Sequence, residues 1–435
     1  MKMKFGSQSG QVLMVTMGVS GLLAFVLLGY LKLVSSQYSS TVRSQAWNLA
    51  MPVAEAGIEE ALTHLYYNGP ANLATNGWSY SNGDYVKERV VGDSQYQVHI
   101  RNAWLPVIYS TGTSPLPVGG GYVSRRIRVT ARRSALFAKG MVAKSQIDIY
   151  GNNVGFDSFD SADPDHSTQG RYDPTKAKDN GDVATNSSLT NSLALGNADV
   201  KGKVATGPGG SIDIGPNGAV GDAAWHASGQ HGIKPGWSSD DMNVSFPDVT
   251  QPFTSGYMVP TRQLVDGVWV DHVLNSSGNW LLSNQTGSIL VKSNVNAVLL
   301  LTGDLKISGQ NYIRVQSGAS LKLYVKGSTA DISGLGAINS SGNASNLFYY
   351  GLPSNTSLTM TGNGQFTGVI YAPEADFHLG GGGSDIQDFI GASVSSTVQM
   401  NGHFNFHYDE NLGRIEYARG YIVTSWNEVP VDYNN

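Results

Sequence analysis

The sequence contains no cysteine among its 435 residues, which excludes a small fold crosslinked by disulfide bonds. Charge is also scarce, because Asp, Glu, Lys and Arg make up 14% of the chain, against about 25% in a typical soluble domain. A disordered acidic or basic tail needs far more charge, so that class is excluded as well. The lack of cysteine suits a reducing cytoplasm and equally an exported bacterial protein without disulfides.

Glycine is abundant instead, with 53 of 435 residues, where the usual share of about 7% would give about 30. Such a content excludes a long coiled coil or a helical bundle, because glycine destabilises helix interiors. Glycine and asparagine accept a positive φ, which tight turns between strands require. The composition therefore predicts a β-rich protein with many turns, and the length predicts more than one folded unit.

The charge is divided unevenly along the chain. Residues 1–134 contain 12 Lys and Arg against 6 Asp and Glu, whereas residues 135–435 contain 16 against 27, so the net charges are +6 and −11. The two parts are therefore predicted to be different modules. A nucleic acid is not expected as a partner, because the basic residues are scattered and the larger part would repel phosphate.

Residues 12–31 form a run of about 20 uncharged and mainly apolar residues, enough to cross a hydrocarbon layer of about 30 Å as a helix. Lys2 and Lys4 precede this run, so the positive-inside rule places the N-terminus in the cytoplasm and the body outside the membrane. A cleaved secretory signal peptide is the alternative. It would have a shorter apolar stretch followed by a cleavage site of small residues.

Apolar residues continue beyond this run at spacings of three and four, the period of an amphipathic helix. They are Leu49, Val53, Ala56, Ile58, Ala61, Leu62 and Leu65, with Glu55, Glu59 and Glu60 on other faces. We therefore predict one long helix over residues 11–67, with its membrane part at 12–31.

Three features together resemble the N-terminus of type IV pilin-like proteins: a leader with two lysines that ends in Gly10, the apolar stretch QVLMVTM, and AEAGIEEAL at residues 54–62. The resemblance is to PilX-type minor pilins and, more distantly, to the K-type pseudopilin of type II secretion. It implies that residues 1–10 are a leader and that a prepilin peptidase at the inner membrane cuts between Gly10 and Gln11, with methylation accompanying this processing. It further implies that the helix then packs with other pilin-like subunits in a filament.

Val15 is the fifth residue counted from Gln11, a position where major pilins usually carry Glu. In that family the carboxylate is thought to pair with the N-terminal ammonium of a neighbouring subunit, and an unpaired buried ammonium is costly. The resemblance therefore implies a subunit at one end of a filament, or one that starts it. An ordinary single-pass anchor is the alternative.

Residues 68–134 have a different period. The segments 84–91, 96–104, 106–112 and 122–133 alternate apolar and polar residues between Gly-rich or Pro-rich turns. This pattern predicts a four-stranded antiparallel meander. A small sheet on the exposed half of a long helix is the pilin-like arrangement, so helix and meander are expected to form one unit.

Residues 135–412 repeat a short strand, a tight turn with Gly beside Asn or Gln, and another strand, as in LKISGQNYIRV from Leu305. Units this short bury an apolar face only when they stack, so we predict a parallel β-helix or solenoid, with a β-sandwich as the alternative. Polar stretches at 157–182 and 223–260 are interpreted as long excursions, and residues 413–435 as a C-terminal strand and tail. Phrases such as FTGVIYAPEADFHLGGGG, from Phe366, resemble the C-terminal region that accompanies PilX-type N-termini.

Candidate chemistry in this region is sparse. The carboxylates from Asp157 to Asp182 lack the spacing of a calcium loop, so a solvated acidic loop is expected there and calcium binding stays open. The pairs His403 with His407 and Asp385 with Asp388 are weak candidates for a metal and for glycosidase chemistry, with strand and turn packing as the expected role. We therefore predict no catalytic residue, no metal and no cofactor.

Tryptophan side chains are stronger candidates for binding a ligand or a partner than these titratable residues are. They are Trp225, Trp237, Trp269 and Trp280, which are expected to be exposed within residues 223–283 and able to stack on a sugar or contact a partner. The sequence thus predicts a minor pilin-like structural subunit that displays a solenoid for adhesion, with surface carbohydrate or protein as candidate partners. An envelope-anchored solenoid outside any filament and a polysaccharide-active surface enzyme are the alternatives.

Overall fold

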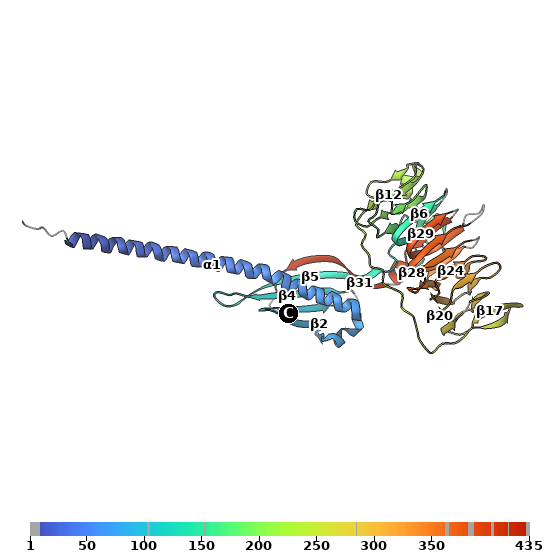
Figure 1. The fold of residues 1–435 in the computed structure, drawn as a ribbon, viewed down its shortest axis with the longest axis horizontal. Helices are drawn as coiled ribbons and strands as arrows, with labels where there is room; N and C mark the ends of the chain where they lie inside the picture. Colours follow the sequence, from blue (N-terminus) through green and yellow to red (C-terminus); the bar gives the residue numbers. More distant parts are fainter. Residues whose placement is uncertain are drawn as a thin grey trace, which may run out of the picture. The chain divides into compact units, whose positions relative to one another are not determined.

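The computed structural model describes residues 9–101, 105–151, 154–283, 285–361, 365–381, 387–401, 404–415 and 417–431. The chain folds as two compact units (Figure 1). Unit 1 contains residues 1–134 and 419–435, and unit 2 contains residues 135–418. Unit 2 is therefore an insertion in the sequence of unit 1.

Unit 1 combines one long helix with an antiparallel sheet. The helix α1 spans Ser9–Asn68 and is followed by the short helix η1 (Pro70–Asn76). The sheet has the order β1-β2-β3-β4-β5-β31. Its strands are β1 (Ser79–Ser81), β2 (Asp84–Val91), β3 (Ser94–Arg101), β4 (Val107–Pro115), β5 (Tyr122–Ala135) and β31 (Tyr417–Val429). The predicted meander of four strands is confirmed as β2 to β5.

Two strands of this sheet were not predicted to belong to it. β1 extends the meander at one edge by antiparallel pairing with β2. β31 lies beside β5 at the other edge, where the Arg125 guanidinium donates two hydrogen bonds to the Glu428 carboxylate at 2.8 and 2.6 Å. The sheet is therefore completed by residues about 300 positions further along the sequence.

The second half of α1 packs on this sheet through small and branched side chains. Its buried members are Val42, Ala46, Ala50, Val53, Ala54, Ile58, Ala61 and Leu65. The buried side chains from Val53 to Leu65 meet the inward side chains of β3 to β5, among them Val98, Ile108 and Ile127. Leu49, which the periodicity assigned to the same face, is instead exposed. The prediction for Leu49 is wrong because the buried stripe passes through the alanines at 46, 50 and 54 rather than through the larger neighbour.

Unit 2 is a three-sided stack of short parallel strands. Its first column is β18 (Gly278–Leu282), β20 (Asn296–Leu301), β23 (Ser320–Val325), β26 (Leu347–Gly351), β28 (Phe366–Leu379), β29 (Gln387–Asn401), β6 (Met141–Tyr150), β8 (Val183–Thr185), β11 (Val204–Ala205) and β15 (Ser238–Ser239). Its second column is β21 (Leu305–Ile307), β24 (Thr329–Ile332), β27 (Ser357–Met360), the second halves of β28, β29 and β6, β9 (Leu193–Ala194) and β12 (Ile212–Asp213).

The third column begins with an antiparallel hairpin of β16 (Thr261–Val265) and β17 (Val268–Leu274). It continues in parallel through β19 (Ile289–Val291), β22 (Ile313–Val315), β25 (Ala337–Asn339), the first halves of β28 and β29, β30 (Phe404–Asp409), β7 (Gly155–Phe159), β10 (Asp199–Lys201), β13 (Ala219–Gly221) and β14 (Gly232–Ile233). Asn339 Nδ2 donates to Thr367 O and links β25 to β28. The predicted parallel stacking is confirmed, and these parallel pairs exclude the β-sandwich alternative.

The coils of this stack do not follow one another in sequence order. The first coil in sequence, which contains β6, lies in the interior of the stack and pairs with β29, the last long strand. From β6 the coils proceed past β12 to β15, after which the chain crosses to the opposite end and builds back from β17 toward β29 (Figure 1). Tyr371 Oη donates to Pro247 O at 2.7 Å and ties the crossing segment to the stack. The two ends of unit 2 therefore lie on neighbouring coils.

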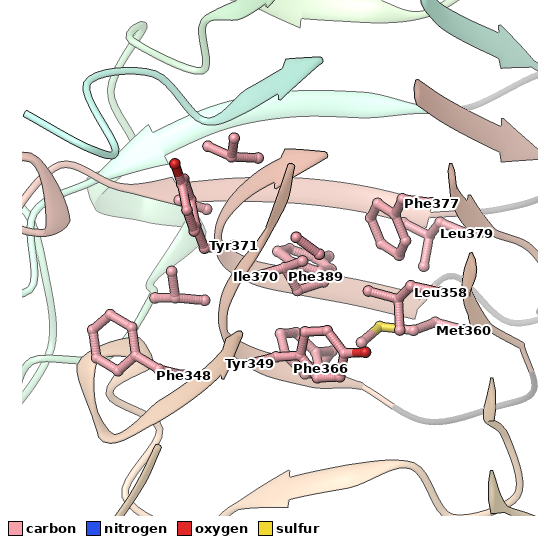
Figure 2. Packing of buried hydrophobic residues seen from close by; sticks show 14 of the residues in the cluster. Phe348, Tyr349, Leu358, Met360, Phe366, Ile370, Tyr371, Phe377, Leu379 and Phe389 are labelled. Carbon is pink, nitrogen blue, oxygen red and sulfur yellow. The ribbon is translucent and has the colours of Figure 1, made fainter. Parts of the chain in front are cut away.

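Inward side chains form a continuous apolar core along the stack. Figure 2 shows its centre, where Tyr349, Phe366, Ile370, Phe377 and Phe389 pack inside coils formed by β26 to β29. The rings of Phe389 and Phe406 stack at 4.6 Å, and the ring of Phe156 stacks on that of Phe406 at 5.7 Å. This ladder crosses from the last coils of the sequence into the first one. Aromatic contacts thus join coils that are more than 200 residues apart in the chain.

Candidate functional site

The first half of α1 presents a large exposed apolar surface. Its large apolar side chains from Val12 to Val34 are all exposed, and none of the 18-residue window that is apolar enough to cross a membrane is buried within the structure. We call residues 12–34 the apolar helix segment; Lys32 is its only charged residue. A surface this apolar needs a bilayer or other protein to cover it.

The three residues predicted for processing and assembly lie at the start of this segment. Gly10 and Gln11 belong to the first turn of α1, which begins at Ser9. The side chain of Val15 is 64% exposed, so it contacts almost nothing within the chain. The first turn of α1 contains no acidic residue.

The AEAG stretch has a structural role in unit 1. A Cβ at Gly57 would lie against the Ser110 hydroxyl and 2.9 Å from Tyr96 Cδ2, and one at Gly112 of β4 would overlap the backbone of Ala50 and Ala54. The helix and the sheet therefore approach closely only because glycine stands at both positions. This contact holds the second half of α1 and leaves the apolar helix segment without a partner in the described chain.

Glu60 was expected on another face of the helix, but its side chain lies at the same interface and makes polar contacts there. Its carboxylate pairs with Lys87 at 3.1 Å and with Arg89 at 2.5 Å, and it accepts a hydrogen bond from the Tyr96 hydroxyl. Burial by itself would raise the pKa of Glu60, but the hydrogen bonds from Tyr96 and Lys87 and the two cations outweigh burial and lower it. Burial and the contact with Glu60 raise the pKa of Tyr96.

A group of titratable side chains in unit 2 surrounds His407 on β30. Its Nδ1 lies 2.5 Å from Asp157 Oδ1 and its Nε2 lies 3.3 Å from Asp388 Oδ1. The ring of Tyr172 stacks on the imidazole at 3.7 Å, and its hydroxyl donates to Asp157 at 2.8 Å. Burial by itself would lower the pKa of His407, but hydrogen bonds and attraction from Asp157 and Asp388 outweigh burial and raise it.

This arrangement corrects the prediction of a solvated acidic loop at 157–182. Asp157 and Asp160 are buried, and Asp160 pairs with Arg414 at 2.5 Å. Asp182 pairs with Lys139 at 3.0 Å, and Asp173 accepts from Thr168 and Thr175. Each of these carboxylates has its own partner, so they do not converge on one ion, and the described part of the chain holds no cluster of metal-ligating side chains. His403 and Asp385 lie outside the described residues.

The four tryptophans proposed as exposed aromatics differ in their surroundings. Trp280 is buried in the core and donates its indole hydrogen to Ser276 O at 3.1 Å. Trp225 and Trp237 are half-buried. Trp269 on β17 is 56% exposed and receives the Arg262 guanidinium over its ring at 5.0 Å. Exposure is therefore confirmed for Trp269 and wrong for Trp280, whose strand alternation directs it inward.

Comparisons with known proteins give few matches. A family model described as a domain of unknown function (DUF7305) matches residues 270–415, about a third of the chain. No curated protein matches the sequence. A solved structure that is similar is the competence-associated pilin ComZ from Thermus thermophilus, with 12% identity over 88% of this chain and 97% of that chain and a TM-score of 0.26. A TM-score this low carries no argument, so the function must be argued from the chain's own residues.

Proposed function

We propose that the chain is a minor pilin-like subunit of a type IV pilus-type filament that displays unit 2 on its outside. One observation carries the proposal. The apolar helix segment continues without a break into the half of α1 that packs on the antiparallel sheet, so one continuous helix joins a bilayer-compatible surface to a folded unit. Such a helix can leave the membrane and pack against the same helix of other subunits without refolding.

The proposal includes processing by a prepilin peptidase between Gly10 and Gln11, while the helix is in the inner membrane. It places the N-terminus in the cytoplasm and unit 2 outside before assembly, and at the cell surface afterwards. Because Val15 offers no carboxylate to a neighbouring N-terminal ammonium, an end position in the filament is favoured over a repeated one. The role is structural, and no catalytic residue or cofactor is assigned.

The mature N-terminus, determined by mass spectrometry of the protein from cells, tests the processing step. We expect Gln11 as the first residue, and a Gly10→Val variant should keep residues 1–10 because a branched side chain replaces the glycine at the cut. Gly6→Val is the matched control and should be processed normally. A mature protein that begins at Met1 would contradict the proposal and favour an ordinary single-pass anchor.

Purified filaments test the assembly step separately. The protein should be present in them at a small fraction of the major subunit, and labelled antibodies against unit 2 should bind at filament ends. Labelling along the whole filament would contradict the end position. Filaments that contain none of the protein would favour an envelope-anchored protein that never assembles.

A further inference from the structure

A groove with both polar and apolar lining runs along one face of unit 2, and Phe377 and Val398 lie between its polar side chains. It has a volume of about 350 Å³ and lies on the second column, across the second halves of β28, β29 and β6. Two rows of outward side chains form its walls, and the strand register sets them opposite one another. One row is Asp376, Thr397 and Gln146, and the other is His378, Gln399 and Asp148.

This groove exists only because of the order of the coils. Gln146 and Asp148 come from the first coil in the sequence, whereas the other four side chains come from the last two. The pairing of β29 with β6 brings them into one surface. Neither half of unit 2 contains the complete lining by itself.

The lining side chains are already linked along each row. Thr397 Oγ1 donates to Asp376 Oδ1 at 2.7 Å, and His378 Nδ1 lies 3.0 Å from Gln399 Oε1. The Tyr150 hydroxyl donates to Asp148, and its ring is 49% exposed two residues beyond Asp148 on the same strand, β6. These bonds hold amide, imidazole and carboxylate groups in place beside a free aromatic face, so little side-chain freedom would be lost when a ligand binds.

The chemistry of the groove excludes several ligand classes. Two carboxylates and no lysine or arginine line it, so nucleic acids and acidic polymers would be repelled. An extended peptide cannot add as a strand, because the strands on both sides are already paired. Asp376 and Asp148 lie on strands two spacings apart, about 9.6 Å, and are also offset by two residues along the strands, which is too far for both to bind one cation.

We propose that this groove binds a neutral, hydroxyl-rich oligosaccharide that lies along the stack. Carboxylates and amide oxygens accept hydrogen bonds from sugar hydroxyls, the amide and imidazole nitrogens donate to ring and hydroxyl oxygens, and the Tyr150 ring provides a stacking face for a pyranose. The parallel strands repeat these groups along the stack, as the sugars of a polymer repeat along its length. This inference does not depend on whether the chain assembles into a filament.

Calorimetric titration of the full chain in detergent micelles tests it. The probes are chitohexaose, cellohexaose and maltohexaose, with a hexamer of galacturonic acid as the acidic comparison. We expect saturable binding of at least one neutral hexamer and none of the acidic one. Replacing both carboxylates, Asp148→Ala with Asp376→Ala, should weaken that binding at least about tenfold, since losing one hydrogen bond to a charged acceptor costs about tenfold or more in affinity.

Two matched controls separate binding from folding. Asp213→Ala removes the same charge from the same row, two strands beyond Asp148 and outside the groove, and should leave the affinity unchanged. Tyr150→Phe keeps the ring and should bind within about threefold of the unchanged protein, whereas Tyr150→Ala should not. Equal affinity of the double carboxylate variant and the unchanged protein, preference for the acidic hexamer, or no binding of any neutral hexamer would each overturn the proposal.

Discussion

Asp157 Oδ1 and His407 Nδ1 lie 2.5 Å apart although 250 residues separate them in the sequence. Asp157 lies on β7, which completes the first coil, and His407 lies on β30, which completes the last one. Their contact, together with the pairing of β30 and β7, joins the two ends of unit 2. Formation of this contact therefore indicates that the coils have stacked in their native order.

The first prediction concerns pH. The pKa of His407 is raised in the folded protein, so protonated His407 stabilises the fold. This contribution is complete below the ordinary histidine pKa of about 6.5 and is lost as the pH rises through the higher folded value. Urea unfolding of the unchanged protein and of His407→Gln between pH 5 and pH 9 should show a stability difference that shrinks as the pH rises. A difference that grows with pH would contradict the assigned charge state.

The second prediction concerns the contact of α1 with the sheet. Gly112→Ala places a methyl group on the backbone of Ala50 and Ala54, so the helix must move away from β4. We expect a loss of about 1–3 kcal/mol of stability in unit 1, measured by thermal unfolding followed by circular dichroism. Gly29→Ala is the control, because nothing lies within 4 Å of a Cβ at that position and alanine favours the helix. Equal melting curves for the two variants would show that the helix does not need this close approach.

The third prediction concerns the aromatic ladder through the junction of the coils. Phe406 is fully buried between Phe389 and Phe156. Phe406→Ala should leave a cavity and cost about 3–5 kcal/mol, whereas Phe406→Leu should cost less than half as much because it fills most of the space. Chemical denaturation of both variants measures the two costs. Similar small losses for both would mean that the junction repacks without the rings.

The fourth prediction separates the tryptophans by fluorescence. Trp269 is largely exposed and Trp280 is buried. Trp269→Phe should therefore shift the mean emission to shorter wavelength and remove the component that iodide quenches most, while Trp280→Phe should shift the emission to longer wavelength. The opposite assignment would show that the β16–β17 hairpin packs differently in solution.

Local sequence patterns were sufficient to predict most of the helix and the strands of unit 1. An uncharged apolar run long enough to cross a bilayer specifies a helix. Alternation along residues 84–133 specifies half-buried strands, because a period of two puts every second side chain on the core face. The buried stripe of α1 was only partly predictable, since Leu49 and the alanines at 46, 50 and 54 compete for the same face, and only the close approach at Gly112 favours the smaller side chains.

The sequence by itself also determined that the remaining residues form short strands joined by tight turns, because glycine and asparagine supply the turns. It further determined that these strands stack, because no single coil buries its apolar face. The order of the coils was decided only in the tertiary structure. The strands of different coils have similar backbone edges and similar inward apolar side chains, so the local sequence does not specify which coils become neighbours. Unit 2 must return to its starting point for β31 to join β5, and this brings β29 onto β6 and Asp157 onto His407. Long-range pairing of this kind has no local signal, so both the His407 cluster and the groove across β28, β29 and β6 could be found only in the folded molecule.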